Sequence, residues 1–524
     1  MFYDDSAANH LNKVDGVSND AYSAGRVRRS FVHFLVGKSA SAVVGLILLL
    51  ALVRVLEREE YGLFIVLLAA LEIIPLASSL GVFPALNRYI PELRSTGRGW
   101  ALARLVVATS LWRLVTLSIA CGVYAMLADQ LAPALGFAAS SAIFALYAWV
   151  ILFEGLARFF DVVFESLLMQ GATQVSILLR NGFRLAGLAF LVSNGPVALL
   201  DWVWVEVIGS ASACIFAIFF VYRHVSFMAR DQPGEKLVLS LARIRAYSTP
   251  AYLAQLVGVI QGPDVVKLLV AKLAGAVQTG AFGFAAAIGG MLQRYLPVFL
   301  LIGMVRPLFV SQHARDANAG KLVQLANLVF KLNVFVLAPA TMLFVAAGEQ
   351  IASLLSGGKF PEAGPYLVAF AVLLVMQTLH TVLGLIALAV EEGRASLHGT
   401  LFGLAGLAVG LAAYPKYGPL ALCGGLIVSE LIWCGVMQLA LRRHGIRFVL
   451  DWTGMVKIWG LAGVVSLPVW MQHTGTDGAS LITLIAATGV MALLYLGFAR
   501  ALRPFSAAER GLINRVLPRP VFIW

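Results

Sequence analysis

The chain has 524 residues, of which 60% are hydrophobic and only 13% are charged. Soluble domains carry about a quarter of charged residues, so this composition excludes a soluble globular protein and indicates one whose solvent is lipid. The net charge of +12 does not indicate a nucleic-acid partner, because lysine and arginine concentrate in the two tails and in every second gap between apolar segments, as the positive-inside rule expects.

The N-terminal tail, residues 1–30, is polar and shows no apolar core before a small-residue cleavage site, so it does not resemble a signal peptide. The first apolar segment begins near Phe31, directly after Arg26, Arg28 and Arg29. A basic cluster ahead of a membrane segment favours a cytoplasmic N-terminus. We therefore expect the first membrane helix to be retained in the protein.

About fourteen segments are apolar over the roughly 20 residues that a helix needs to cross a bilayer. Their approximate ranges are 31–56, 61–83, 101–126, 139–160, 174–194, 199–222, 244–263, 281–305, 324–348, 364–390, 397–414, 417–440, 456–473 and 479–500. Continuous runs of this length exclude a β-barrel, whose strands alternate over about ten residues. An even number of spans places the C-terminus in the cytoplasm too. The sequence predicts an all-α polytopic membrane protein.

An internal repeat organises these segments. LVRVLEREEYGLF at 52–64 has a similar but less charged counterpart, VAKLAGAVQTGAF, at 270–282. Further matches follow in the same order along the chain: Pro75 with Pro297, Gln130 with Gln350, and Glu206 with Glu430. Six helices in each copy give both copies the same orientation, a parallel repeat. We predict two six-helix lobes followed by two more helices.

The predicted division of the chain has six parts. They are a cytoplasmic tail at 1–30, an N-lobe with helices 1–6 at 31–222, a cytoplasmic linker at 223–243, a C-lobe with helices 7–12 at 244–442, helices 13 and 14 at 443–503, and a cytoplasmic tail at 504–524.

The charged turn between the first two helices, Glu57 to Glu60, is predicted as a solvated loop at the outer membrane face. Gly62 and its counterpart Gly280 are expected to permit tight turns. Pro75 and Pro297 each remove a backbone hydrogen bond. Their freed carbonyls must face protein or a wet cavity, because lipid cannot satisfy them; a tolerated kink is the alternative.

Basic residues inside the apolar segments are costly, by at least about 2.5–3.5 kcal/mol at the bilayer centre, and so favour the bundle interior or a wet cavity. The residues predicted to line a cationic cavity are Lys38, Arg113, Arg180, Arg184 and Arg294. Snorkelling to the headgroups is the alternative for Lys38. Arg180 and Arg184 share one helix face, where they either bind a phosphate or pair with Glu154.

Acidic residues in the same segments are candidates for gating or ion coupling: Glu72, Glu154, Glu206 and Glu430. Glu72 and Arg294 each precede the shared proline by three residues, with opposite charge, and a pair between them across the lobes is predicted. Lys331 is expected to snorkel and His380 to be a satisfied interior histidine. We expect no catalytic residues and no metal site, because the cysteines lie in apolar segments without ligand spacing.

Several stretches resemble one transporter family. RVLEREEYGLF at 54–64 followed by GVFPALNRYIPE at 81–92 is similar to the start of polysaccharide transporters, the O-antigen and exopolysaccharide flippases of the multidrug/oligosaccharidyl-lipid/polysaccharide flippase superfamily. The stretches 263–285 and 348–370 resemble later passages of that family, and the likeness covers about residues 30–500. It implies two lobes around a central cationic cavity. A single deep basic residue on the first helix, Lys38, departs from lipid II flippases, which carry several arginines there.

The resemblance and the basic lumen together favour a transporter that is not an enzyme. Guanidinium groups bind phosphate bidentately, and the family moves undecaprenyl-diphosphate-linked oligosaccharides from the inner to the outer leaflet of the inner membrane, for surface or exo-polysaccharide synthesis. The expected partners are this glycan lipid, membrane lipids, and polysaccharide polymerase and export machinery, with no cofactor and a proton or a sodium gradient as the energy source. The alternatives are a multidrug exporter of the same superfamily and a polytopic lipid-dependent glycan polymerase.

Overall fold

The computed structural model describes residues 24–95, 98–167, 169–231, 241–300, 319–390, 392–473 and 481–516. They form α-helices, two short 3-10 helices and connecting turns, with no strand among them. This confirms the predicted all-α polytopic class. Of the predicted tails and linker, residues 1–23, 232–240 and 517–524 lie outside the described ranges.

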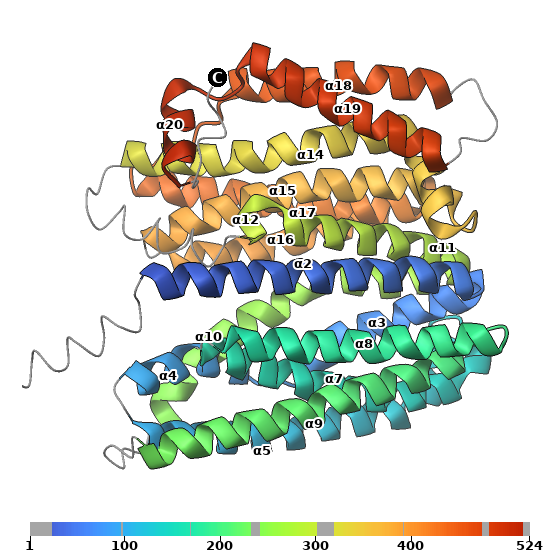
Figure 1. Cartoon of the computed structure of the whole chain (residues 1–524), viewed down its shortest axis with the longest axis vertical. Coiled ribbons are helices and arrows are strands. Elements are labelled where there is room, and N and C mark those ends of the chain that lie inside the picture. The colour runs from blue at the N-terminus through green and yellow to red at the C-terminus, as the bar shows by residue number, and fades with distance from the viewer. Residues whose placement is uncertain are drawn as a thin grey trace, which may run out of the picture.

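The first half of the chain forms the helices that Figure 1 draws from blue to green. They are α2 (Ala24–Val55), α3 (Arg58–Ala77), α4 (Val82–Ser95), α5 (Gly99–Met126), α6 (Ala128–Ala134), η1 (Ala138–Ser140), α7 (Ser141–Ser166), α8 (Gln170–Asn194) and α9 (Leu199–Asp231).

The second half forms the helices drawn from light green to red (Figure 1). They are α10 (Leu241–Ile260), α11 (Pro263–Tyr295), α12 (Pro297–Leu300), α14 (Ala319–Ser356), η2 (Pro361–Ala363), α15 (Gly364–Ala389), α16 (Gly393–Tyr417), α17 (Pro419–Arg443), α18 (Trp452–His473), α19 (Leu481–Leu502) and α20 (Ala507–Val516).

Twelve helical stretches of the described chain are long and apolar enough to cross a membrane. One of them, Ala242–Tyr295, runs over both α10 and α11, and α2 adds the shorter apolar helix Ala40–Val55. The sequence predicts about fourteen spans, and the two counts differ at α2 and at the stretch that joins α10 and α11. The boundary between helices 7 and 8 differs from the prediction, since α11 holds two helices that meet at Gly275, where φ is 81°.

Local chemistry explains several helix ends. Glu59 and Glu60 lie in the first turn of α3, where acidic side chains stabilise the positive end of the helix dipole. α11 and α17 begin with Pro263 and Pro419 after a glycine, and proline suits a first helical position because its missing N–H has no partner to lose there.

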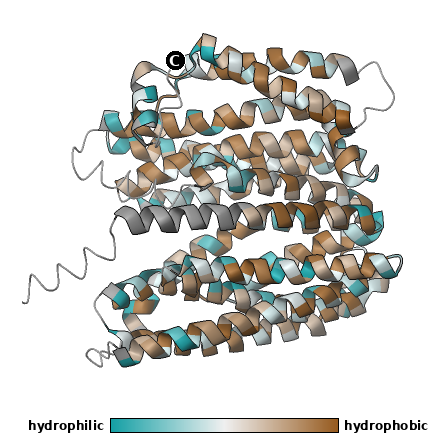
Figure 2. Cartoon of the chain, viewed as in Figure 1, coloured by the Kyte–Doolittle hydropathy of each residue, from teal (hydrophilic) through white to brown (hydrophobic). Residues whose placement is uncertain are grey.

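α2 runs between two groups of helices in Figure 1. On one side lie α5, α7, α8 and α9, and on the other lie α14, α15, α18 and α19. Apolar residues cover the helices along most of their length, while polar residues gather toward helix ends and connections (Figure 2). Large side chains such as Ile215, Ile482 and Leu493 stay exposed, the last at 72%. An apolar surface of this extent suits lipid, so the protein is a multi-pass membrane protein.

The two copies of the repeated joint pack against each other. Gly62 of α3 lies against the backbone of Ala276, and Gly280 of α11 lies against the Phe360 ring and the Arg58 carbonyl. A side chain at either glycine would collide with these neighbours. Both glycines lie inside helices, so their role is close helix approach, and the predicted role in tight turns is wrong.

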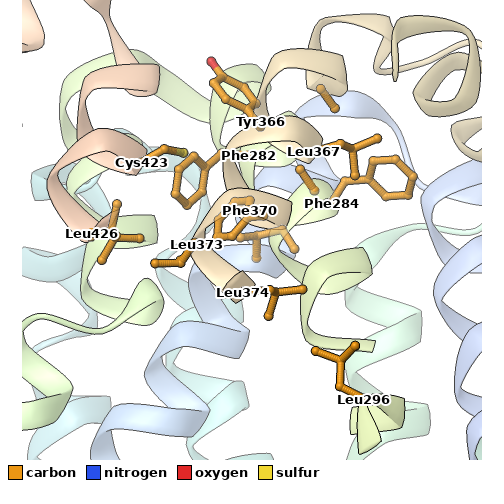
Figure 3. Close-up of a cluster of buried hydrophobic side chains, with 14 of the residues drawn as sticks. Phe282, Phe284, Leu296, Tyr366, Leu367, Phe370, Leu373, Leu374, Cys423 and Leu426 are labelled. Carbon is orange, nitrogen blue, oxygen red and sulfur yellow. The ribbon is translucent and has the colours of Figure 1, made fainter. Parts of the chain in front are cut away.

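An apolar core lies among the helices of the second half of the chain. Figure 3 shows Phe282, Phe370 and Leu373 converging between α11, α15 and α17. The Phe282 and Phe370 rings meet edge to face with centroids 5.2 Å apart, a favoured aromatic geometry. This core holds α11 in place, and the end of α11 reaches the central cavity described below.

Candidate functional site

A cavity of about 500 Å³ lies between the two helix groups. Its walls come from α2, α3, α7, α8 and α9 on one side and from the end of α11 on the other. On α2 the wall runs from Ser41 to Leu52 and stops before Arg54. This is the size and position that a ligand pocket between two helix bundles takes.

Four charged side chains border this cavity within the described chain: Glu165, Arg184, Glu206 and Arg294. Of the five predicted basic residues, the structure thus brings Arg184 and Arg294 to the wall, and the side chain of Lys38 lies outside the described part. Two positive and two negative groups balance, so the described lining is not the cationic surface that the sequence predicts.

Arg180 and Arg184 on α8 pair with carboxylates, which is one of the two alternatives the sequence left open. Arg180 Nη1 lies 2.7 Å from Glu154 Oε1 and Arg184 Nη2 lies 3.2 Å from Glu154 Oε2. Arg184 Nε is also 3.5 Å from Glu206 Oε1, and its Nη2 donates to Ser210 Oγ at 3.2 Å. Arg180 is buried and does not border the cavity.

The network extends along α7. Arg158 lies 2.9 Å from Glu154 and 2.8 Å from Glu72, and Arg180 lies 3.1 Å from Asp161. Three arginines therefore meet four carboxylates across α3, α7, α8 and α9. Asp161 was missed, although its place seven residues after Glu154 puts it on the same helix face. Glu154 accepts from all three arginines, so this network locks the four helices together.

Arg113 does not line the cavity, contrary to the prediction. Its side chain is fully buried. Its guanidinium donates to the Pro75 carbonyl at 2.8 Å and to Ser78 Oγ at 3.0 Å, and it lies 5.4 Å from the centroid of the Phe83 ring. Pro75 belongs to the last turn of α3, whose carbonyls have no partner within the helix. Arg113 thus caps the negative end of α3.

Neither predicted helix-breaking proline borders the cavity or lies mid-helix. Pro75 is buried in the last turn of α3, and a Cβ at Gly155 of α7 would lie 3.4 Å from its ring. Pro297 begins α12 after α11 has ended at Tyr295. Pro75 is therefore a packed residue of the last helical turn, and Pro297 lies at a true helix break.

Glu72 and Arg294 do not pair in this structure, contrary to the prediction. Glu72 pairs with Arg158 because α3 packs on α7. Arg294 is exposed toward the cavity and makes no ion pair with any residue that the structure describes. Among the four charged groups of the lining, Arg294 is the one whose charge is available to a ligand.

A second, smaller cavity of about 320 Å³ lies at the α10–α11 junction, among α15, α16 and α17. His380 Nδ1 lies 2.6 Å from Glu430 Oε2, and the His380 ring stacks on Trp433 with centroids 3.4 Å apart. Glu430 borders this cavity and not the central one. His380 is satisfied inside the bundle, as expected, but its partner is an acid from the predicted coupling set.

Lys331 is not a snorkelling residue. Its side chain is fully buried and lies 2.6 Å from Asp451 and 2.8 Å from Glu509. Partial burial raises the pKa of Asp451, but hydrogen bonds from Lys331 and from the Gly454 amide outweigh it and hold that pKa below its usual value. Lys331 therefore fastens α14 to the start of α18 and to α20.

The end of α2 and the predicted solvated turn after it contact the last turn of α14 and the residues that follow it. Arg54 donates to the carbonyls of Leu354 at 2.8 Å and Leu355 at 3.1 Å. Lys359 in turn donates to the Arg54 carbonyl at 2.7 Å. The carbonyls at a helix C-terminus lack partners and attract cations, so Arg54 caps α14 from the other helix group.

A charged pair completes this contact. Arg58 forms an ion pair with Glu362 and lies 5.3 Å from the centroid of the Phe360 ring. We call the set of Arg54, Arg58, Lys359 and Glu362 the latch. It joins the α2–α3 connection to the end of α14 and the residues after it, and no sequence signal pointed to Lys359.

Comparison with solved structures shows the fold. The inward closed conformation of the lipid II flippase MurJ aligns with a TM-score of 0.63 and 12% identity, over 93% of this chain and 100% of that chain. An inward-facing multidrug resistance MATE family transporter of the MOP superfamily aligns with a TM-score of 0.60 and 15% identity, over 77% and 94%. MATE in the bent conformation aligns with a TM-score of 0.51 and 14% identity, over 83% and 97%. No family model and no curated protein matches the sequence. The chain thus has the fold of MOP-superfamily transporters.

Proposed function

We propose that this protein flips an undecaprenyl-diphosphate-linked oligosaccharide from the inner to the outer leaflet of the bacterial inner membrane. The observation that carries the proposal is the central cavity with Arg294 on its α11 wall, without an ion pair among the described residues. A diphosphate offers oxygens that an arginine binds bidentately, and a cavity between helices lets the lipid tail stay in the bilayer.

The extent of the structural likeness supports a flippase over a multidrug exporter. The lipid II flippase aligns along its whole length with 93% of this chain, whereas the MATE transporter leaves about a quarter of the chain unmatched. α18 and α19 pack on the bundle through α14, where Lys331 and Tyr495 make the contacts. These two helices enlarge the apolar surface, which suits a lipid substrate.

The latch gives this structure a direction of access. It joins α2 and α3 to α14 at one end, so in this state the cavity is approached from the opposite end. Transport by alternating access requires the latch to open while the other end closes. Glu430 with His380, remote from the cavity, is our candidate for coupling this change to a proton or a sodium gradient.

A multidrug exporter is the second candidate, and a specific observation favours it. Glu165 and Glu206 border the cavity, and such exporters move cationic drugs that carboxylates attract. The two functions differ in the sign of the ligand's charge, so one experiment separates them.

The test uses purified protein in proteoliposomes with a fluorescent polyprenyl-diphosphate saccharide, scored by a membrane-impermeant quencher. We expect protein-dependent flipping that Arg294→Ala reduces by about 10- to 100-fold, the worth of a charge-assisted contact. Arg442→Ala is the matched control, since Arg442 is exposed at the end of α17. Transport of a cationic dye in place of the lipid, with Arg294→Ala without effect, contradicts the flippase and supports the exporter.

A further inference from the structure

The α9 wall of the central cavity carries polar atoms without partners. Trp202 and Glu206 lie one turn apart on α9, and both border the cavity. They are buried, with exposed fractions of 2% and 3%. Within the described part of the chain, the Trp202 indole N–H makes no hydrogen bond, and Glu206 Oε2 makes none of ordinary geometry, although the buried Tyr147 hydroxyl lies beside this carboxylate. A buried polar atom without a partner costs free energy, so the Trp202 indole N–H would be stabilised by a polar group that accepts a hydrogen bond from it.

These two atoms have complementary hydrogen-bonding chemistry. The indole N–H only donates, and an ionised carboxylate only accepts. Glu206 Oε1 is 3.5 Å from Arg184 Nε, so this ion pair uses one carboxylate oxygen, and Oε2 can accept a further hydrogen bond beside the Tyr147 hydroxyl. On α8, Gln174 and Asn181 border the same cavity, and an amide side chain both donates and accepts.

A saccharide fits this wall and a phosphate does not. A sugar hydroxyl donates and accepts at once, so it satisfies an indole N–H and a carboxylate together. Phosphate oxygens accept, and their charge is repelled by Glu206 and Glu165. The phosphate groups of the same headgroup fit the α11 wall instead, where Arg294 lies.

We propose that Trp202 and Glu206 are the specificity-determining residues that bind the sugar hydroxyls of the headgroup, while Arg294 binds its diphosphate. This inference rests on the proposed function. It orients the headgroup across the cavity, with the sugar on α9 and the diphosphate on α11, and it makes the protein selective for a glycosylated lipid over the bare polyprenyl diphosphate.

The test measures binding of two probes to the purified full-length protein by native mass spectrometry. One probe is a short-chain polyprenyl diphosphate, and the other is the same lipid with a monosaccharide on its terminal phosphate. Selectivity is the ratio of the two Kd values. We expect Trp202→Phe, which removes only the indole N–H, to lower selectivity by about 5- to 30-fold, the worth of one buried hydrogen bond. Trp204→Phe is the matched control, since Trp204 is 52% exposed and should leave selectivity unchanged.

Glu206→Gln tests the same wall if Trp202→Phe does not fold. It removes a negative charge at constant size, so we expect saccharide selectivity to fall while the bare diphosphate binds as well as before or more tightly. Equal weakening of both probes in either variant indicates a purely structural role and overturns the inference.

The remaining outcomes separate the two proposals. If the unmodified protein binds both probes and the two variants keep its selectivity, the sugar-binding role is wrong and the flippase proposal stands. If the unmodified protein binds neither probe better than a zwitterionic phospholipid of similar size, the proposed function fails and this inference fails with it.

Discussion

The helix pairs α8–α9 and α16–α17 occupy matching places in the predicted repeat but are held together differently. α8 and α9 meet through Arg184, which contacts Glu206 at 3.5 Å and Ser210 at 3.2 Å. α16 and α17 meet backbone to backbone: a Cβ at Gly410 would lie 3.0 Å from the Ala421 carbonyl, and one at Gly425 2.8 Å from the Gly406 carbonyl. One pair is fastened by charges and the other by glycines.

This difference separates the two predicted lobes. The charged pair α8–α9 borders the central cavity and places polar side chains on its wall. The glycine-packed pair α16–α17 does not border the central cavity, and its small residues let the two helices approach closely in lipid. The polar residue that matches Glu206, Glu430, is turned toward His380 and the smaller cavity.

We expect the largest loss of stability when the network of ion pairs around Glu154 is broken. Glu154→Ala removes the acceptor shared by three arginines. Loss of one partner from a buried ion pair costs about 3–5 kcal/mol, so we expect a loss of that size in the free energy of unfolding, measured by denaturation in lipid–detergent micelles. Glu72→Ala is the control, since the half-exposed Glu72 carboxylate forms one ion pair among the described residues, with Arg158, and its loss should cost about 1 kcal/mol or less. Equal losses would show that Glu154 is not the centre of the network.

Disturbing the glycine contacts between α16 and α17 should lower the free energy of unfolding by a smaller amount. Gly406→Ala places a methyl group against the backbone of Ser429, and overpacking of this kind costs about 1–3 kcal/mol. Gly424→Ala on α17 meets no atom within 4 Å, and we expect it to be neutral or slightly stabilising, because alanine favours helix over glycine by about 1 kcal/mol. The same denaturation assay checks both. If the two variants are equally stable, close backbone packing does not hold α16 to α17.

Glu430→Gln tests whether Glu430, the residue of α17 that matches Glu206, couples transport to an ion gradient. The His380 and Glu430 side chains are 37% and 20% exposed, so we expect a stability loss of about 1 kcal/mol or less. Transport should persist but lose its dependence on an imposed ion gradient. The measurement is flipping in proteoliposomes with and without the gradient, with Glu349→Gln, an exposed acid, as the control. Gradient dependence that survives in Glu430→Gln would remove this pair from coupling.

The latch should show the smallest effect on stability. Arg58 and Glu362 are 44% and 28% exposed, and surface ion pairs contribute about 0–1 kcal/mol. A double-mutant cycle of Arg58→Ala and Glu362→Ala should give a coupling in that range. We expect a larger effect on access, with a cysteine-labelling probe entering from the latch end in the double variant. Unchanged labelling would show that Gly62 and Gly280 close this end without the latch.

Sequence reasoning succeeded where a signal is local or periodic. Runs of apolar residues predicted the membrane helices, although the break between helices 7 and 8 fell at Gly275. It also posed the right alternatives for Arg180 and Arg184. It did not reveal that Arg113 caps α3 or that Lys331 joins two acids, because both side chains looked alike as basic residues in apolar runs.

The sequence alone determined that this chain is a bundle of membrane-spanning helices. In lipid, a helix satisfies its backbone hydrogen bonds within one segment, and the length of each apolar segment can be read directly from the residues. Only the tertiary structure decided which arginines of the apolar segments are neutralised and that Arg294 is exposed to the cavity, unpaired among the described residues. The reason is that partners such as Arg54 and Leu355 lie 301 positions apart, and whether they meet depends on how each helix is rotated and packed against the rest.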